Sequence, residues 1–226
     1  MITKRKFPWF GKQQWENIFF IHWRVSPDQL SPYIPKPLQI DTFDGSAWLS
    51  AVCFQATVNQ LRAVPINLIQ PAIQLNIRTY VTLNETEERG VYFFRILLNR
   101  KIPVKAANVT YHLPFSYSHA TFTKKENEII YQINDETKPQ FHVHFQPQKE
   151  KDESPLAQFL TERYCIWNKK RNRLIKIPII HSKWQLQRAE AKIFHQNLHP
   201  LIYGKEPSVI HFHPKKMAYL YPYERF

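Results

Sequence analysis

The chain has 226 residues, and its 31 lysines and arginines against 18 aspartates and glutamates give a formal net charge of +13. It has only four glycines, no two of them close in sequence: Gly11, Gly45, Gly90 and Gly204. This spacing excludes the glycine-rich loops that bind nucleotide phosphates and the G-x-S-x-G turn of many hydrolases. Two cysteines, Cys53 and Cys165, exclude a four-cysteine zinc site, a C-x-x-C redox pair and a disulfide scaffold.

Length and a hydrophobic content of 43% are sufficient for a single domain with a large core. We expect one domain over residues 1–226, beginning with a basic segment at residues 1–14. No apolar run approaches the roughly 18–20 residues of a membrane span. The residues after Lys4–Lys6 are too polar for the apolar part of a signal peptide, so we expect a cytoplasmic protein that does not enter the membrane.

Three short helices are predicted in chain order. Ser26 and Pro27 form a helix start, with Ser26 as the N-cap and Pro27 at the first helical position. Ser154-Pro155 repeats this pattern before a segment whose apolar residues recur every three and four positions. The third predicted helix runs over residues 183–198.

The remaining regular segments are predicted strands, since they combine β-branched and aromatic residues with turn signals at their ends. We place them at residues 48–58, 73–83, 91–98, 106–111, 120–123, 129–133, 141–145, 163–167, 174–180 and 209–221. The polar residues 146–153 are expected to form a surface loop. Many strands with few helices predict a mostly β fold, built as a closed or partly closed antiparallel barrel.

The strand at residues 73–83 is the most informative, because its side chains alternate. One face is apolar: Ile73, Leu75, Ile77, Val81 and Leu83. The other is polar but has no Lys or Glu: Gln74, Asn76, Arg78, Tyr80 and Thr82. An ordinary surface strand also alternates, and that alternative stays open. In a barrel, however, the polar row points into the lumen, where a guanidinium can bind a carboxylate.

Ordered segments over about residues 15–215 resemble a bacterial family known as domain of unknown function 2071. They are Phe20–Val25, Asp41–Leu49, Asn76–Val81, Gly90–Phe94, Tyr111–Phe115 and Phe159–Tyr164, followed by His181 and Trp184. The resemblance implies a barrel related to acetoacetate decarboxylase, whose lumen holds the active site. That enzyme forms a Schiff base through a lysine. Phe115 and Ser116 stand where the resemblance places its lysine pair, so imine chemistry is not expected. Gln74 replaces an acid common in related sequences.

Together these patterns predict a lumen that binds a small organic anion without a cofactor. Arg24 and Arg78 are the candidate anion partners, and Gln74, Asn76 and Tyr80 are the candidate hydrogen-bonding residues. Tyr111 and His112 are a candidate proton-transferring pair at the mouth of the pocket. Whether the protein is an enzyme stays open at this point.

The charge of +13 also permits a different function, namely binding to nucleic acid or to an anionic surface. Its basic residues are spread over small groups, such as Lys124-Lys125 and Lys169–Arg171, that have the composition of hairpin tips. No nucleic-acid-binding motif accompanies them, so this is the alternative rather than the leading hypothesis.

Histidine pairs raise the question of a metal site. His142 and His144, like His211 and His213, have the spacing that points two imidazoles from one face of a strand. Four nitrogens could coordinate a metal only if the two pairs converge. No carboxylate or cysteine accompanies either pair in sequence, so no metal is predicted.

Overall fold

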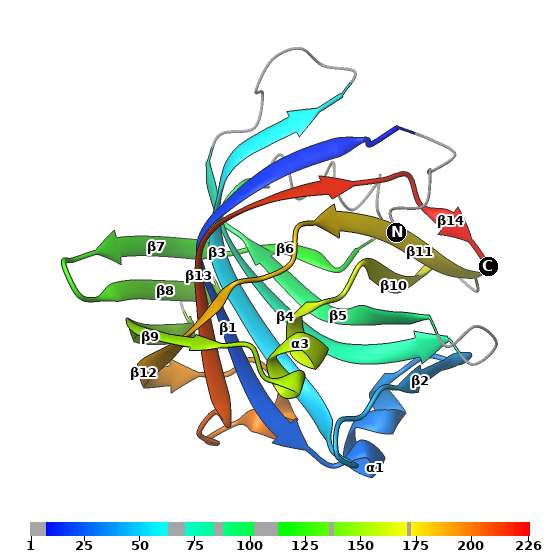
Figure 1. The fold of residues 1–226 in the computed structure, drawn as a ribbon, viewed down its shortest axis with the longest axis horizontal. Coiled ribbons are helices and arrows are strands. Elements are labelled where there is room, and N and C mark those ends of the chain that lie inside the picture. Colours follow the sequence, from blue (N-terminus) through cyan, green and yellow to red (C-terminus); the bar gives the residue numbers. More distant parts are fainter. Residues whose placement is uncertain (1–7, 63–70, 84–87, 102–112, 136–137, 171–172) are drawn as a thin grey trace.

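The computed structural model describes residues 8–62, 71–83, 88–101, 113–135, 138–170 and 173–226. Strands dominate this part of the chain (Figure 1). They are β1 (Gly11–Val25), β2 (Leu38–Ile40), β3 (Ala47–Leu61), β4 (Ala72–Leu83), β5 (Arg89–Leu98), β6 (Phe115–Tyr117), β7 (His119–Lys124), β8 (Ile129–Asp135), β9 (Lys138–Asp152), β10 (Cys165–Lys170), β11 (Arg173–His181), β12 (Leu186–Gln196), β13 (Val209–Leu220) and β14 (Glu224–Arg225). Helices are short: α1 (Pro27–Leu30), α3 (Pro155–Thr161) and the 3-10 turns η1 (Ser31–Tyr33) and η2 (Pro200–Ile202).

Seven of these strands close a barrel. Their order is β11, β10, β5, β4, β3, β1 and β13, and β13 pairs back onto β11. The pairing is antiparallel except between β10 and β5 within the ring, and between β5 and the short β6 beside it. The predicted mostly β, mostly antiparallel and closed architecture is therefore confirmed.

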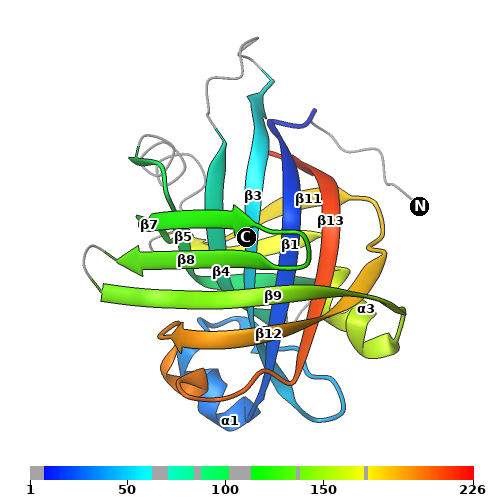
Figure 2. The ribbon, with the colours of Figure 1, turned by 90° about the vertical axis from the view of Figure 1, so that its left-hand side faces the viewer.

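A second layer covers one side of the barrel. Strands β7, β8, β9 and β12, which we call the outer sheet, continue from β13 and cross in front of β1, β3 and β13 (Figure 2). Apolar side chains from the two layers form the largest core, with Phe19 stacked on Phe145 at a ring-centroid distance of 4.0 Å. Leu75 and Ile77 of β4 belong to this core. The first half of the apolar face of β4 therefore packs beneath the outer sheet, and the polar side chains of that half are left for the barrel interior. Val81 and Leu83 belong to a separate cluster with Trp167.

Strand β1 was not predicted, and a bulge explains why. Asn17 has a positive φ of 50°, a conformation that asparagine tolerates better than most residues. The register of β1 against β3 shifts between Glu16 and Phe19. Gln13 and Trp15 face the barrel interior before the bulge, whereas Ile18 and Phe20 face it afterwards. The period of two is therefore interrupted in the sequence.

Two of the three predicted helices are present. Pro27 is the first residue of α1, although Ser26 makes no side-chain capping hydrogen bond. Helix α3 follows Ser154, whose hydroxyl accepts a hydrogen bond from the Ala157 N–H at 3.2 Å. The helix predicted at residues 183–198 is wrong, because residues 186–196 form β12. The side chains of Ala189, Ala191 and Ile193 alternate with polar ones and pack on the core, as in a strand with one covered face.

The loop predicted at residues 146–153 is also wrong. Residues up to Asp152 continue β9, and Gln146 and Asp152 pair with Glu190 and Leu186 of β12. Backbone pairing with a neighbouring strand thus outweighs the polar composition of this segment. The strand predicted at residues 106–111 lies outside the described residues. No helix in the described part of the chain has the length and apolar character needed to cross a membrane.

Candidate functional site

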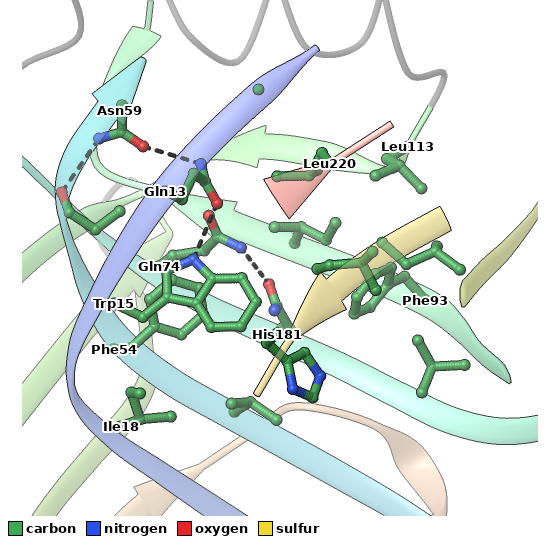
Figure 3. Close-up of a pocket in the computed structure, with 18 of the residues that line it drawn as sticks. Gln13, Trp15, Ile18, Phe54, Asn59, Gln74, Phe93, Leu113, His181 and Leu220 are labelled. Atoms are coloured by element: carbon green, nitrogen blue, oxygen red, sulfur yellow. Dashed lines mark hydrogen bonds between the residues drawn. The ribbon is translucent and has the colours of Figure 1, made fainter. Parts of the chain in front are cut away.

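A cavity of about 200 Å³ lies inside the barrel. Strands β1, β3, β4, β5, β10, β11 and β13 contribute side chains to its wall, together with residues just after α3. In Figure 3, Trp15 and Phe54 form one side, and Phe93, Leu113 and Leu220 form the other. Most lining side chains are apolar, and a few polar groups converge among them, which is the usual make-up of a small-molecule site.

The polar face of β4 supplies the main polar row of this wall. Gln74, Asn76 and Arg78 all line the cavity, as alternation in the sequence indicates. The Gln74 Nε2 group donates a hydrogen bond to Asn76 Oδ1 at 2.7 Å. This bond occupies the amide oxygen of Asn76 and leaves its Nδ2 group as a donor.

Arg78 adds a positive charge to this polar row. Its Nη2 donates to the Leu160 carbonyl at 3.3 Å, and its guanidinium lies over the rings of Phe20 and Tyr80 at 5.7 and 5.8 Å. The Nε atom is buried and has no hydrogen-bond partner. Among the described residues, no carboxylate forms a salt bridge with Arg78. The residue as a whole is only partly buried, and its guanidinium lies on the cavity wall.

A second arginine on the same wall forms a buried salt bridge. The Nη1 of Arg163 lies 2.5 Å from Asp41 Oδ2, and its Nε donates to the Phe159 carbonyl at 2.8 Å. Arg163 also lines the cavity, and its Nη2 is buried without a partner. Burial lowers the pKa of Arg163, and the Asp41 carboxylate opposes that change. The two residues of this pair are 122 positions apart in the sequence.

His181 is a titratable group on the cavity wall. Burial lowers its pKa below 6.5, although the ring donates a hydrogen bond from Nδ1 to the Ser182 carbonyl at 3.0 Å. The ring stacks on Tyr164 at 4.8 Å. At neutral pH the imidazole is therefore uncharged and can accept a proton.

Tyr80 and Arg24, two of the predicted ligand-binding residues, do not reach the cavity. Beyond Phe20, on the side away from the cavity, a buried hydrogen-bonded group fills the lumen. The Tyr80 hydroxyl lies 2.6 Å from Ser50 Oγ, and Ser50 Oγ lies 2.6 Å from His22 Nδ1. Arg24 lies beyond this group with an exposed side chain, 5.4 Å from the Trp48 ring. Tyr80 follows Arg78 in the predicted polar row of β4, but neither Tyr80 nor Arg24 is among the residues that line the cavity.

Tyr111 and His112, the predicted proton-transferring pair, lie outside the described residues. The neighbouring Phe115 lines the cavity. Its phenyl ring stands where the resemblance to acetoacetate decarboxylase implies a lysine, and it cannot form a Schiff base.

The two histidine pairs do not share partners. His144 Nδ1 lies 2.8 Å from Glu128 Oε1, and His142 lies against Phe194. His211 Nε2 lies 3.2 Å from Asp152 Oδ2, while His213 donates to the Gln185 carbonyl. Over the described ranges, no group of three or more His, Cys, Asp or Glu side chains is arranged to hold a metal ion.

Arg163 and His181 are two wall residues that were not predicted from the sequence to belong to the site. Both lie in segments that carry the family resemblance, so a signal was present. It could not be separated from a structural role, since Arg163 follows Glu162 directly and His181 ends a strand.

The fold is shared with several solved enzymes. The structure aligns with acetoacetate decarboxylase from Legionella pneumophila at a TM-score of 0.68 and 11% identity, covering 99% of this chain and 90% of that one. It aligns with the enduracididine biosynthesis enzyme MppR, with HEPES buffer bound, at 0.69 and 10%, with coverages of 99% and 90%. An acetoacetate decarboxylase-like enzyme from Sphingomonas wittichii RW1 gives 0.70 and 10%, with coverages of 97% and 94%.

Sequence comparisons define the relationship more closely. The protein YqjF of Bacillus subtilis (strain 168), described as uncharacterized, is 30% identical over 229 residues, which is 96% of this chain and 93% of that protein. The model of the DUF2071 family, described as an uncharacterized conserved protein, matches residues 12–216. The chain therefore belongs to the DUF2071 family and has the acetoacetate decarboxylase-like fold.

Proposed function

We propose that this protein binds a small organic monocarboxylate in the barrel cavity, with Arg78 binding the carboxylate. The observation that carries the proposal is that the Arg78 guanidinium lies on the wall of a mostly apolar cavity and has no carboxylate partner among the described residues. Asn76 lies two positions away on the same face of β4, and its Nδ2 group is available as a second donor. Charge-assisted hydrogen bonds of this kind are about twice as strong as neutral ones.

The fold neighbours support an organic acid as the ligand. MppR has been solved with pyruvate and with a condensation product of pyruvate and imidazole 4-carboxaldehyde. We propose the same general class of ligand for this cavity but not the same chemistry, because Phe115 cannot act as an amine nucleophile. His181 is the group that we expect to exchange a proton with a bound acid if the protein catalyses a reaction.

The surface charges do not favour the alternative of nucleic-acid binding. Several basic side chains lie in ion pairs with acidic neighbours: Lys125 with Glu128, Lys176 with Glu88, Arg188 with Glu150 and Lys215 with Glu16. Such pairs reduce the positive field on which non-specific binding to phosphates depends.

Arg78→Met tests the proposal, with Arg24→Met as the matched control. Hydrogen bonds to charged groups contribute about 1.5–3 kcal/mol, so we expect Arg78→Met to weaken the binding of butanoate about 10- to 150-fold. Arg24→Met removes the same charge outside the cavity and should leave the affinity unchanged. Isothermal titration calorimetry with sodium butanoate measures both. An Arg78→Met protein that is folded by circular dichroism and binds butanoate as tightly as the wild type would refute the proposal.

A further inference from the structure

The cavity wall is mostly apolar, and this restricts the kind of acid that fits. Trp15 and Phe54 face Phe93 and Leu220 across this space (Figure 3). Each of these side chains comes from a different strand, so apolar surface surrounds the space rather than covering one side of it. A ligand whose carboxylate is at Arg78 must extend along this apolar surface.

Three amide side chains on the same wall, those of Gln13, Asn59 and Gln74, already have partners within the protein. Gln13 Nε2 donates to Asn59 Oδ1 at 2.9 Å, and Gln13 Oε1 accepts from Trp15 Nε1 at 3.0 Å. Gln74 donates to Asn76. A ligand group that bonded to these amides would have to replace existing hydrogen bonds, with little net gain. An apolar group replaces no hydrogen bond, and its transfer from water to the cavity is favourable.

The volume of the cavity limits the length of the ligand. An apolar cavity of about 150 Å³ is large enough to bind benzene, which has six carbons. A cavity of 200 Å³ therefore has room for a carboxylate and an apolar tail of a few carbons.

We propose that the ligand is a short-chain amphiphilic monocarboxylate, with its carboxylate at Arg78 and its alkyl tail between Trp15 and Leu220. This inference rests on the proposed function, because Arg78 must first bind the carboxylate. It goes further in naming the class: an acid with an apolar tail binds more tightly than a hydrophilic acid of the same size and charge.

Two comparisons on the full-length protein test this inference by isothermal titration calorimetry. The first uses sodium acetate, propanoate, butanoate and pentanoate. Each added methylene that leaves water should raise the affinity about fourfold, so pentanoate should bind about 15-fold more tightly than propanoate. The second compares butanoate with pyruvate, which has the same charge and the same number of non-hydrogen atoms. Butanoate should bind more tightly.

A variant that fills the upper cavity provides an independent measurement. Ala72 is buried on the cavity face of β4, so Ala72→Leu should reduce the affinity for pentanoate and leave that for acetate unchanged. Ala191→Leu is the matched control, because Ala191 packs on the core beneath the outer sheet and not in the cavity.

The outcomes separate this inference from the proposed function. An affinity that does not change along the acid series, or tighter binding of pyruvate than of butanoate, refutes the apolar-tail ligand. If Arg78→Met also abolishes binding in that case, carboxylate binding at Arg78 stands. If none of the acids binds, both proposals fail.

Discussion

Neutralising Asp41 should weaken the fold. The Asp41 and Arg163 side chains are 7% and 2% exposed, and their charged atoms are 2.5 Å apart. Removing one partner of a buried ion pair costs about 3–5 kcal/mol, because the other charge stays buried without compensation. The asparagine oxygen in Asp41→Asn can still accept a hydrogen bond from Arg163. We therefore expect the free energy of unfolding to fall by about 3 kcal/mol, at the lower end of that range.

The same substitution should strengthen the binding of anions. Arg163 lines the cavity, and in the wild type the negative charge of Asp41 offsets the positive charge of its guanidinium. In Asp41→Asn the guanidinium is left uncompensated beside the ligand. One additional hydrogen bond to a charged group contributes about 1.5 kcal/mol or more, so the affinity for butanoate should rise about tenfold.

Guanidinium chloride unfolding measures the first effect, and calorimetric titration with butanoate measures the second. Arg89→Gln is the control, since Arg89 Nε lies 3.6 Å from Asp41 Oδ2 but its side chain is 65% exposed. Exposed pairs contribute about 0–1 kcal/mol. Equal losses of stability in Asp41→Asn and Arg89→Gln, or a lower affinity for butanoate in Asp41→Asn, would refute the reasoning.

Two further predictions concern the scaffold. Gly90→Ala should lower the free energy of unfolding by about 1–3 kcal/mol, because the added Cβ would lie 2.6 Å from atoms of Cys165 and Trp167. A melting temperature equal to that of the wild type would contradict the close approach of β5 and β10. His22 is fully buried, and burial holds its pKa well below 6.5, so the folded protein keeps it neutral while the unfolded chain takes up a proton near that pH. Its contribution to stability is therefore complete above pH 6.5 and is lost as the pH falls below that value. His22→Gln should reduce this acid-side loss in denaturant titrations, whereas the exposed His119→Gln should not; equal pH dependence in both variants would show that His22 is not the cause.

The cavity wall contributed by β4 could be predicted because its period of two is unbroken over the relevant residues. Gln74, Asn76 and Arg78 follow one another on one face, and the structure places all three on the wall. Their role in ligand binding stays a prediction. Where the lumen ends could not be predicted, since His22 and Ser50, which fill it from other strands, are distant in sequence.

The incorrect secondary-structure predictions arise where a local sequence pattern disagrees with the pairing of strands that are distant in sequence. The bulge at Asn17 reverses the alternation within β1 and hides the strand. In β12, Leu186, Ala189 and Ile193 also fit a helical spacing, and only the pairing with β9 and β13 selects the strand. The charge on the cavity wall could not be predicted from local patterns either. Arg163 is neutralised by Asp41, which is far away in sequence, whereas Arg78 has no such partner within the described ranges.

Strand β1 hydrogen-bonds to β13, so the ring that encloses the cavity joins segments from the two ends of the chain. Bringing such distant segments together carries a large entropic cost before any contact is gained, and proteins rich in such pairings fold slowly, on the order of milliseconds to seconds. During synthesis the barrel cannot close until β13 has left the ribosome. Until then, β1 has one unpaired edge, and the wall lacks Leu220. Formation of the cavity is therefore coupled to closure of the ring, and a molecule that binds only in the closed cavity would stabilise the closed ring.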